Sequence, residues 1–295
     1  MATETAPLTT QLRLASANGP VTRTILQTPL RDATAEEIPI IDVSPMFGSE
    51  LADRKALAKQ IRDAATNMGF FYIKNHGDME TKMKADSYKT PHQNGYRGPD
   101  TQRINPDEGI DVREGFSYRY DPKNDPEVED PDAVPEEVRR LLKCEEYPWE
   151  KTANMPSFKE RVVAYYRECL KLARALTRAF ALSLELPEAY FDDKVRYPDG
   201  AFGLNYYPPI PQPRSPGDPG ARVSIGSHTD FQLFTILWQD LSGGLQVLSR
   251  EGQWLNAAPV RDTFVVNIAD CLQRITNDVY VSTVHRAQNW SGGRG

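Results

Sequence analysis

The feature that most constrains the fold of this chain is a series of short β-type segments that begins near residue 201. None is longer than eight residues, and each is rich in β-branched or aromatic side chains and bounded by turn signals. Closely spaced short strands of this kind are typical of antiparallel sandwiches and jelly rolls. The segments are residues 202–207, 234–238, 244–248, 253–256, 263–268 and 280–287.

Two helices are predicted before this β-rich part. Apolar side chains in residues 51–68 share one helix face, and Gly69 stands where that helix should end. The second and stronger pattern covers residues 157–186. At its start, Ser157 and Glu160 predict a capping box, in which each side chain bonds a free backbone amide of the first turn.

These elements predict an α+β protein that is mainly antiparallel β: a distorted double-stranded β-helix, or jelly roll, with flanking helices. Residues 1–37 lack a sustained hydrophobic period and are predicted to form a flexible N-terminal tail. Residues 38–150 should form an N-terminal region with a strand, a helix and loops. Residues 151–295 should form the supporting helix and the jelly-roll core, as one structural unit with residues 38–150.

Composition and charge exclude several functional classes. A formal net charge of −6 provides no basic stripe for nucleic acid. No apolar run is long enough to span a bilayer, and the first residues lack the basic and apolar regions of a secretory signal. The three cysteines are widely spaced and form no metal or disulfide pattern. We therefore expect a cytoplasmic protein without nucleic-acid or membrane partners.

Two of the four histidines lie on strand-like segments of the C-terminal half. His228 begins a His228-Thr229-Asp230 motif, and His285 lies in the β-branched run 281–286. Alternate residues of a strand face the same side, so His228 and Asp230 should offer an imidazole and a carboxylate to one small volume. Two histidines and one carboxylate suit a non-haem Fe(II) that keeps open positions for dioxygen and a co-substrate.

The residues alone leave other interpretations open. A His-x-Asp tripeptide is a weak signal, and a simple hydrogen bond between His228 and Asp230 would explain it equally well. The same ligands would also suit a hydrolytic zinc ion. A serine hydrolase is disfavoured, because no G-x-S-x-G elbow accompanies the serines near His228. Of the other histidines, His76 is expected to pack at a turn and His92 to be solvated.

Short motifs spread along the chain occur in an order that is typical of one enzyme family. They are Ile38-Pro39-Ile40-Ile41-Asp42, Gly69-Phe70-Phe71-Tyr72, Asn75-His76-Gly77, Asn205-Tyr206-Tyr207-Pro208, His228-Thr229-Asp230, Gly244-Leu245-Gln246-Val247, Trp254, Val266-Asn267-Ile268-Ala269-Asp270 and Val284-His285-Arg286. Each motif alone is weak, but the ordered set is specific. From about residue 38 to its end, the chain resembles the 2-oxoglutarate- and Fe(II)-dependent dioxygenases related to isopenicillin N synthase.

The resemblance implies a jelly-roll barrel with iron at its mouth, held by His228, Asp230 and His285. It also implies that Asn205 and Tyr207 help to hold the carboxylates of 2-oxoglutarate, which is consumed together with dioxygen. The implied activity is the oxidation of a small organic molecule by hydroxylation, desaturation or ring formation, as in secondary metabolism.

Two departures from the family's pattern bear on this expectation. Only four residues separate Asn75-His76-Gly77 from Lys82-Met83-Lys84, where the family has a helix. The family's strand after the last histidine carries an Arg-x-Ser pair, whose arginine grips the distal carboxylate of 2-oxoglutarate. Arg294 lies near that place but is followed only by Gly295, so the barrel is expected to lack its last strand.

The departures keep two alternatives open beside the 2-oxoglutarate-dependent oxygenase. One is an iron oxidase that works without 2-oxoglutarate, as isopenicillin N synthase does. The other is a catalytically inactive, shortened relative. Arg294 is the predicted replacement for the family's arginine.

Overall fold

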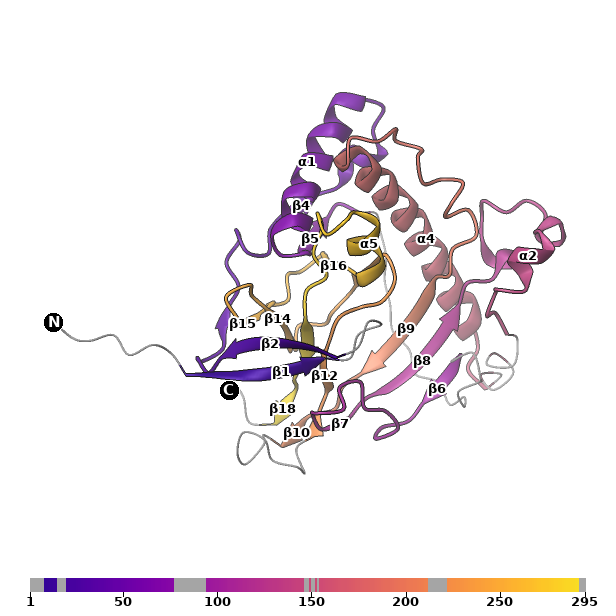
Figure 1. Ribbon diagram of the computed structural model, residues 1–295. Helices are drawn as coiled ribbons and strands as arrows, with labels where there is room; N and C mark the ends of the chain where they lie inside the picture. Colours follow the sequence, from indigo (N-terminus) through magenta and orange to yellow (C-terminus); the bar gives the residue numbers. More distant parts are fainter. Residues whose placement is uncertain are drawn as a thin grey trace.

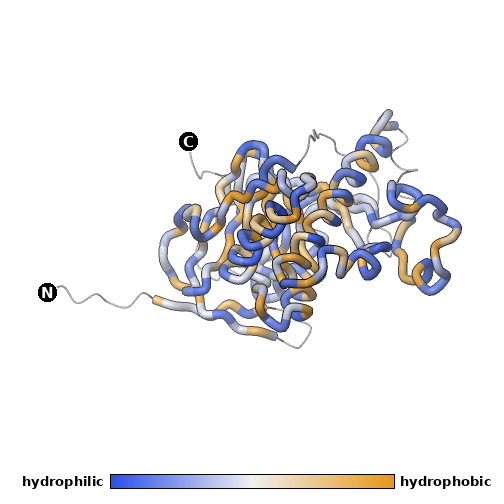
Figure 2. The backbone as a smooth tube through the Cα atoms, turned by 90° about the horizontal axis from the view of Figure 1, so that it is seen from above, coloured by the Kyte–Doolittle hydropathy of each residue, from blue (hydrophilic) through white to orange (hydrophobic). Residues whose placement is uncertain are grey.

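The computed structural model describes residues 8–14, 20–76, 94–145, 149, 152, 154–211 and 222–291. Helices α1 and α4 lie side by side against the β-rich part (Figure 1). Figure 2 shows hydrophobic segments gathered in the interior and hydrophilic ones on the outer loops. The helices are α1 (Leu51–Asn67), α2 (Glu136–Arg139), α4 (Phe158–Ser183) and α5 (Asp270–Ile275), with 3₁₀ turns at Ser44–Phe47, Pro122–Asn124 and Pro131–Ala133. The strands are β1 (Thr9–Leu14), β2 (Val21–Leu26), β3 (Arg31–Asp32), β4 (Ile40–Asp42), β5 (Phe70–Lys74), β6 (Gly95–Arg97), β7 (Ile110–Asp111), β8 (Glu114–Arg119), β9 (Ala201–Tyr206), β10 (Ile210–Pro211), β11 (Arg222–Val223), β12 (Ile225–His228), β13 (Phe234–Leu237), β14 (Leu245–Leu248), β15 (Trp254–Asn256), β16 (Phe264–Ile268), β17 (His285–Ala287) and β18 (Trp290–Ser291).

A four-stranded sheet in the order β13-β16-β5-β4 forms the middle layer of the molecule. On one of its faces, Phe71 and Val266 pack with the buried side chains of α1 and α4. On the other face, Phe70 and Val265 pack with apolar residues of β14 and β15. Because both faces are covered, β16 is buried along its whole length and reads as a continuous apolar run.

The second sheet has the order β12-β17-β14-β15-β3. Strand β17 pairs antiparallel with β12 on one side and β14 on the other, which places His285 opposite both His228 and Val247. The two sheets face each other across the shared apolar layer. Within the described residues, only the two-residue strand β18 follows β17, and it pairs with β10.

The two long helices begin and end close to the predicted positions, but one cap differs. Gly69, just after α1, has a φ of +72°, and a Cβ there would lie 2.0 Å from the carbonyl oxygen of Val281, so only glycine fits.

The capping box predicted for α4 is wrong. Ser157 has a left-handed φ of 65° and makes no side-chain capping bond, because a capping serine needs an extended backbone. No helix in the described part of the chain is long and apolar enough to cross a membrane.

The prediction of a flexible tail over residues 1–37 is wrong for the part that the structure describes. Strands β1 and β2 form an antiparallel hairpin, and β3 extends the second sheet beside β15. Leu12 and Leu14 are buried against Leu248 and Trp254. Two alternate leucines are too short a pattern to predict a strand, and the contacts that stabilise this one come from residues more than 200 positions away.

A third sheet, β6-β8-β9, lies against α4. Its strand β9 falls on the predicted segment 202–207, whereas β6 and β8 lie in the N-terminal region, where one strand, one helix and loops were predicted. Phe116 and Tyr118 of β8 pack with Phe158 and Tyr166 of α4. Side chains alternate along a strand, so the residues between them stand on the opposite face. This second face of β8 and β9 carries Asn205, one of the predicted co-substrate residues.

Candidate metal centre and co-substrate site

His228, Asp230 and His285 come together at the end of the β12–β17 pair. The Nε2 atoms of His228 and His285 lie 3.6 Å and 3.7 Å from Oδ1 of Asp230. One possible ligand atom from each residue lies within 4.8 Å of the others. Bonds of about 2.1 Å to one octahedral ion would place neighbouring ligand atoms roughly 3 Å apart. The three side chains are therefore close to the geometry that a shared metal ion needs.

Asp230 reaches this position from a loop and not from the strand on which it was predicted. Strand β12 ends at His228, so strand alternation does not set the direction of the carboxylate. Instead, the backbone N–H of Asp270 donates to the carbonyl of Asp230 at 2.8 Å. Thr229 Oγ1 donates to the Asp270 carboxylate at 3.1 Å. The start of α5 thus fixes the loop that carries Asp230.

The strand that carries His285 is also shorter than the predicted segment 280–287. It begins only at His285. The preceding backbone is held by the end of α1: the N–H of Val281 donates to the carbonyl of Ala65 at 3.0 Å, and Thr283 Oγ1 donates to the carbonyl of Met68. The backbone N–H of Val281 is consequently not available for a β ladder.

Backbone carbonyls orient both imidazole rings. Nδ1 of His228 lies 2.7 Å from the carbonyl oxygen of Gly226, and Nδ1 of His285 lies 3.1 Å from that of Thr283. A protonated Nδ1 that donates to a carbonyl leaves Nε2 with a free lone pair, as metal ligation requires. Burial lowers the pKa of His285 to about 4, so this ring is neutral at pH 7.

Asp230 is fixed by two neutral donors on one oxygen. Oδ2 accepts from Thr235 Oγ1 at 2.6 Å and from Asn267 Nδ2 at 2.8 Å, while Oδ1 points toward the histidines. Burial alone would raise the pKa of Asp230, but the hydrogen bonds and the nearby histidines hold it well below its usual range. The carboxylate is therefore ionised, with one oxygen free to bind a cation.

The two predicted co-substrate residues lie on or just after β9. The Asn205 amide lies over Gly115 of the neighbouring strand, with Oδ1 3.0 Å from the place of a Gly115 Cβ. Burial raises the pKa of the Tyr207 phenol; the positive charge of Arg113 opposes this rise and the charge of Asp230 adds to it. The phenol is thus close enough to the Asp230 carboxylate to respond to its charge.

Four functional candidates were not predicted as such. Thr235 and Asn267 hold Asp230, and they are direct partners across the β13–β16 pair. Asn267 belongs to a family-like motif, but its direction depends on a strand register that the sequence does not reveal. Arg97 and Arg113, next to the Tyr207 region, are the other two. The alternation of Phe116 and Tyr118 with small residues was a usable strand signal for β8.

The remaining predictions concern histidines, cysteines and segments outside the triad. His76 packs its ring against Phe264 at a centroid distance of 4.3 Å, as expected for a packing role. His92, Lys82-Met83-Lys84 and Arg294 lie outside the described residues. The cysteines Cys144, Cys169 and Cys271 form no disulfide in the described part of the chain, in line with the sequence.

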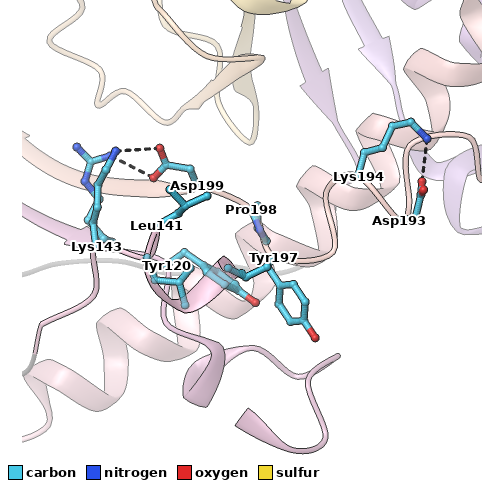
Figure 3. A pocket seen from close by; sticks show the side chains of 11 residues that line it. Tyr120, Leu141, Lys143, Asp193, Lys194, Tyr197, Pro198 and Asp199 are labelled. Atoms are coloured by element: carbon cyan, nitrogen blue, oxygen red, sulfur yellow. Dashed lines mark hydrogen bonds and ion pairs between the residues drawn. The ribbon is translucent and has the colours of Figure 1, made fainter. Parts of the chain in front are cut away.

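A pocket of about 250 Å³ lies at the far end of β8 from Arg113 (Figure 3). Its walls include Tyr120, Leu141 and Tyr197, and Lys143 donates to Asp199 at 3.2 Å on its edge. None of its lining residues belongs to the His228, Asp230 and His285 cluster. It is therefore a separate feature from the candidate metal centre.

Comparisons with known proteins agree on one family. The 2OG-Fe(II) oxygenase superfamily matches residues 198–294, and the N-terminal family of the non-haem dioxygenase in morphine synthesis matches residues 38–77. The 2-oxoglutarate-Fe(II) type oxidoreductase ppzC of Metarhizium majus is 60% identical over 318 residues, covering 99% of this chain and 85% of that protein. This alignment is longer than the 295 residues of the chain and so contains gaps in it.

More distant relatives have the same type of name and fold. The oxidoreductase hxnY of Emericella nidulans, also described as 2-oxoglutarate-Fe(II) type, is 29% identical and covers 86% of this chain and 76% of its own length. The crystal structure of a full-length Neurospora crassa protein in complex with alpha-KG superimposes with a TM-score of 0.67 at 26% identity, covering 87% of this chain and 80% of that one. These neighbours confirm the predicted double-stranded β-helix with flanking helices.

The comparisons also decide between the activities that the sequence left open. The relatives are named as 2-oxoglutarate-Fe(II) type oxidoreductases, which favours a 2-oxoglutarate-dependent enzyme over an oxidase that works without 2-oxoglutarate. The cofactors are accordingly Fe(II), 2-oxoglutarate and dioxygen, and the substrate is unidentified. The chain belongs to the 2-oxoglutarate- and Fe(II)-dependent oxygenase superfamily and is an oxidoreductase of the dioxygenase type.

Proposed function

We propose that His228, Asp230 and His285 bind the Fe(II) of this oxygenase, and that Asn205 and Tyr207 hold 2-oxoglutarate beside it. The observation that carries the proposal is the convergence of two Nε2 atoms and one carboxylate oxygen, each prepared for ligation by a bond to its other polar atom. Two nitrogens and one oxygen on one side leave three octahedral positions open, as non-haem Fe(II) oxygenases require. The role predicted for Arg294 remains a prediction.

The protein's own part in the reaction is to hold and shield the reactants. Fe(II) held by His228, Asp230 and His285 would activate dioxygen, the oxidant of the reaction, with conversion of 2-oxoglutarate to succinate and carbon dioxide. Asp230 is ionised and His285 is neutral at neutral pH, so neither of these two ligands has to lose a proton. We propose a small organic substrate that is hydroxylated, desaturated or closed into a ring.

Succinate formation tests this function directly. Chain reconstituted anaerobically with Fe(II) should produce succinate from 2-oxoglutarate only when both oxygen and iron are present. The measurement is succinate per enzyme with time, and a metal chelator serves as the control. Iron-dependent oxygen consumption that does not respond to 2-oxoglutarate would instead indicate an oxidase. Failure to take up iron would indicate an inactive relative.

Asn267→Ala should weaken iron binding by about 10- to 100-fold, because residues that orient a metal ligand typically contribute this much. The carboxylate of Asp230 would keep only Thr235 as a donor on Oδ2. Equilibrium dialysis against Fe(II) under nitrogen measures the effect. Ser183→Ala is the matched control, since Ser183 is also a buried polar residue but bonds Tyr280 instead. Equal iron affinity in the two variants would contradict the assignment.

A further inference from the structure

Two arginines stand beside the proposed co-substrate residues on the face of the β6-β8-β9 sheet that does not pack against α4. Arg97 of β6 and Asn205 of β9 both lie opposite Gly115 of β8, so one row across the sheet reads Arg97, Gly115, Asn205. Arg113 immediately precedes β8. Gly115 contributes no side chain between Arg97 and Asn205, and the Asn205 amide lies over it, with Oδ1 3.0 Å from the place of a Gly115 Cβ.

The next row across the sheet consists of small residues only. Ser117 of β8 lies opposite Gly95 of β6 and Gly203 of β9. A Cβ on Gly203 would meet just one side-chain atom within 4 Å, the Asn205 amide nitrogen at 3.7 Å. No side chain larger than serine therefore stands on this row, and the row directly adjoins Arg97 and Asn205.

The positive charges of Arg97 and Arg113 are poorly compensated. Both guanidinium groups donate to the same neutral oxygen, Oε1 of Gln102, Arg113 at 2.7 Å. Among the residues that the structure describes, neither forms an ion pair with a carboxylate. Their Nε atoms are buried and have no hydrogen-bond partner in the described part of the chain. Buried cations normally have a paired anion, because desolvation without one is costly.

The charge of the Asp111 carboxylate acts on Arg97, but in the described part of the chain Asp111 forms no ion pair with either arginine. Asp111 Oδ1 accepts from the N–H of Gly226, and Oδ2 accepts from the N–H of Ile104, both at 3.1 Å. Burial and the charge of Arg113 lower the pKa of Arg97, and Asp111 only partly offsets this. The two arginines are thus left with donors for an anion that is not part of the protein.

Arg97 and Arg113 lie on the side of the sheet that is near the candidate metal centre. Arg113 forms a side-chain hydrogen bond with the Tyr207 phenol, and the charge of Asp230 acts on the same phenol, so Tyr207 lies near both the arginines and the candidate metal centre. Arg119, further along β8, lies 3.9 Å from Asp199 and lines the pocket in Figure 3 instead. A molecule held by Arg97 and Arg113 would extend over the small-residue row and remain next to the metal centre.

We propose that Arg97 and Arg113 bind a carboxylate of the primary substrate, which is therefore a small carboxylic acid. This inference rests on the proposed function, because it places the acid beside Asn205 and Tyr207, which hold 2-oxoglutarate. A guanidinium group matches the two oxygens of a carboxylate with parallel N–H donors. The distal carboxylate of 2-oxoglutarate has the same chemistry, so the test has to separate the two sources.

Calorimetric titration with matched acid and amide pairs provides this test. The probes are phenylacetate, 3-phenylpropionate and 4-phenylbutyrate, each with its uncharged primary amide. They are titrated into the protein with Fe(II) and saturating 2-oxoglutarate under nitrogen, and again without both. We expect at least one acid to bind about 10- to 100-fold more tightly than its amide in both states, as for other charge-assisted bonds.

Substitutions then assign the preference to the arginines. Arg97→Gln and Arg113→Gln should each reduce the acid preference about tenfold, and Arg97→Lys should retain part of it because the charge remains. Arg140→Gln, at the exposed residue just after α2, is the control and should keep the full preference. Acids and amides that bind equally, or that both fail to bind, would overturn the proposal. So would an acid preference that persists in both glutamine variants.

Competition between 2-oxoglutarate and the probe acids shows which of the two the arginines bind. If 2-oxoglutarate displaces the acids, and Arg97→Gln weakens 2-oxoglutarate by the same factor, the arginines belong to the co-substrate and the proposal is overturned. Iron-dependent binding of 2-oxoglutarate to wild type tests the proposed function by itself. Its absence would overturn that function, while the acid and amide titrations of the metal-free protein would still decide the arginine site.

Discussion

Asp230→Ala is expected to abolish 2-oxoglutarate-dependent succinate formation, with a loss of at least about 1,000-fold. A metal ligand supports several kcal/mol of charge stabilisation, and each factor of ten in rate corresponds to about 1.4 kcal/mol. The substitution removes the only carboxylate of the triad and leaves the two imidazoles. Iron binding measured by dialysis and succinate measured by chromatography should fall together.

A matched aspartate and a folding check make this result specific. Asp240→Ala also removes a carboxylate in the same half of the chain, but Asp240 is exposed and its carboxylate accepts from the backbone N–H of Ser242. This variant should keep wild-type iron content and activity. Circular dichroism should be unchanged in both proteins. Stoichiometric, tightly bound iron in Asp230→Ala would show that the metal is held elsewhere.

Arg174→Met is expected to lower the free energy of unfolding by about 3 to 5 kcal/mol, because it leaves a buried carboxylate without its partner. Arg174 donates to both oxygens of Asp125, at 2.8 and 2.6 Å, and the Asp125 side chain is 0% exposed. The hydroxyl of Tyr120 donates to the same carboxylate at 2.7 Å. Urea unfolding at pH 7 measures the change.

The exposed pair on the same helix is the natural comparison. Arg178 bonds Asp192 at 2.8 Å, with side chains 55% and 36% exposed. Arg178→Met should therefore cost less than about 1 kcal/mol. Equal costs for the two variants would refute a special role for the buried pair.

Acid should reduce the difference between wild type and Arg174→Met. Burial alone would raise the pKa of Asp125, but its bonds to Arg174 and Tyr120 hold the pKa below the usual value of 3.8. A carboxylate with a depressed pKa in the folded state stabilises the protein above its unfolded pKa. This stabilisation is lost as the pH falls through the lower, folded value. The difference should thus be full at pH 7 and decline below about pH 4.

The β-rich core could be predicted because its strands are locally consistent. Residues 264–268 are apolar at nearly every position and are buried at every position, as a strand covered on both sides must be. The β1 strand was missed because Leu12 and Leu14 become buried only through contact with Trp254 and Leu248. Local pattern cannot report a contact that depends on the position of a distant segment.

In the candidate site, too, some features could be predicted from local motifs and others depend on distant segments of the chain. That His228, Asp230 and His285 lie together could be predicted, and the structure places them within reach of one ion. Their role as ligands remains a prediction. The local backbone differs from the prediction, because Asp230 lies on a loop that is held by the start of α5 and not on a strand. The Thr235 and Asn267 donors depend on the register of β13 and β16, which no short motif encodes.

The position of β17 has a consequence for how the protein is made. This strand lies between β12 and β14, although both precede it in the chain. Until the ribosome has synthesised residues 285–287, the nascent chain lacks β17, which pairs with both β12 and β14, and it lacks the imidazole of His285. The earlier strands must wait with unpaired edges until β17 inserts between them. If His285 is the iron ligand proposed above, the complete iron site can form only after synthesis has passed this residue.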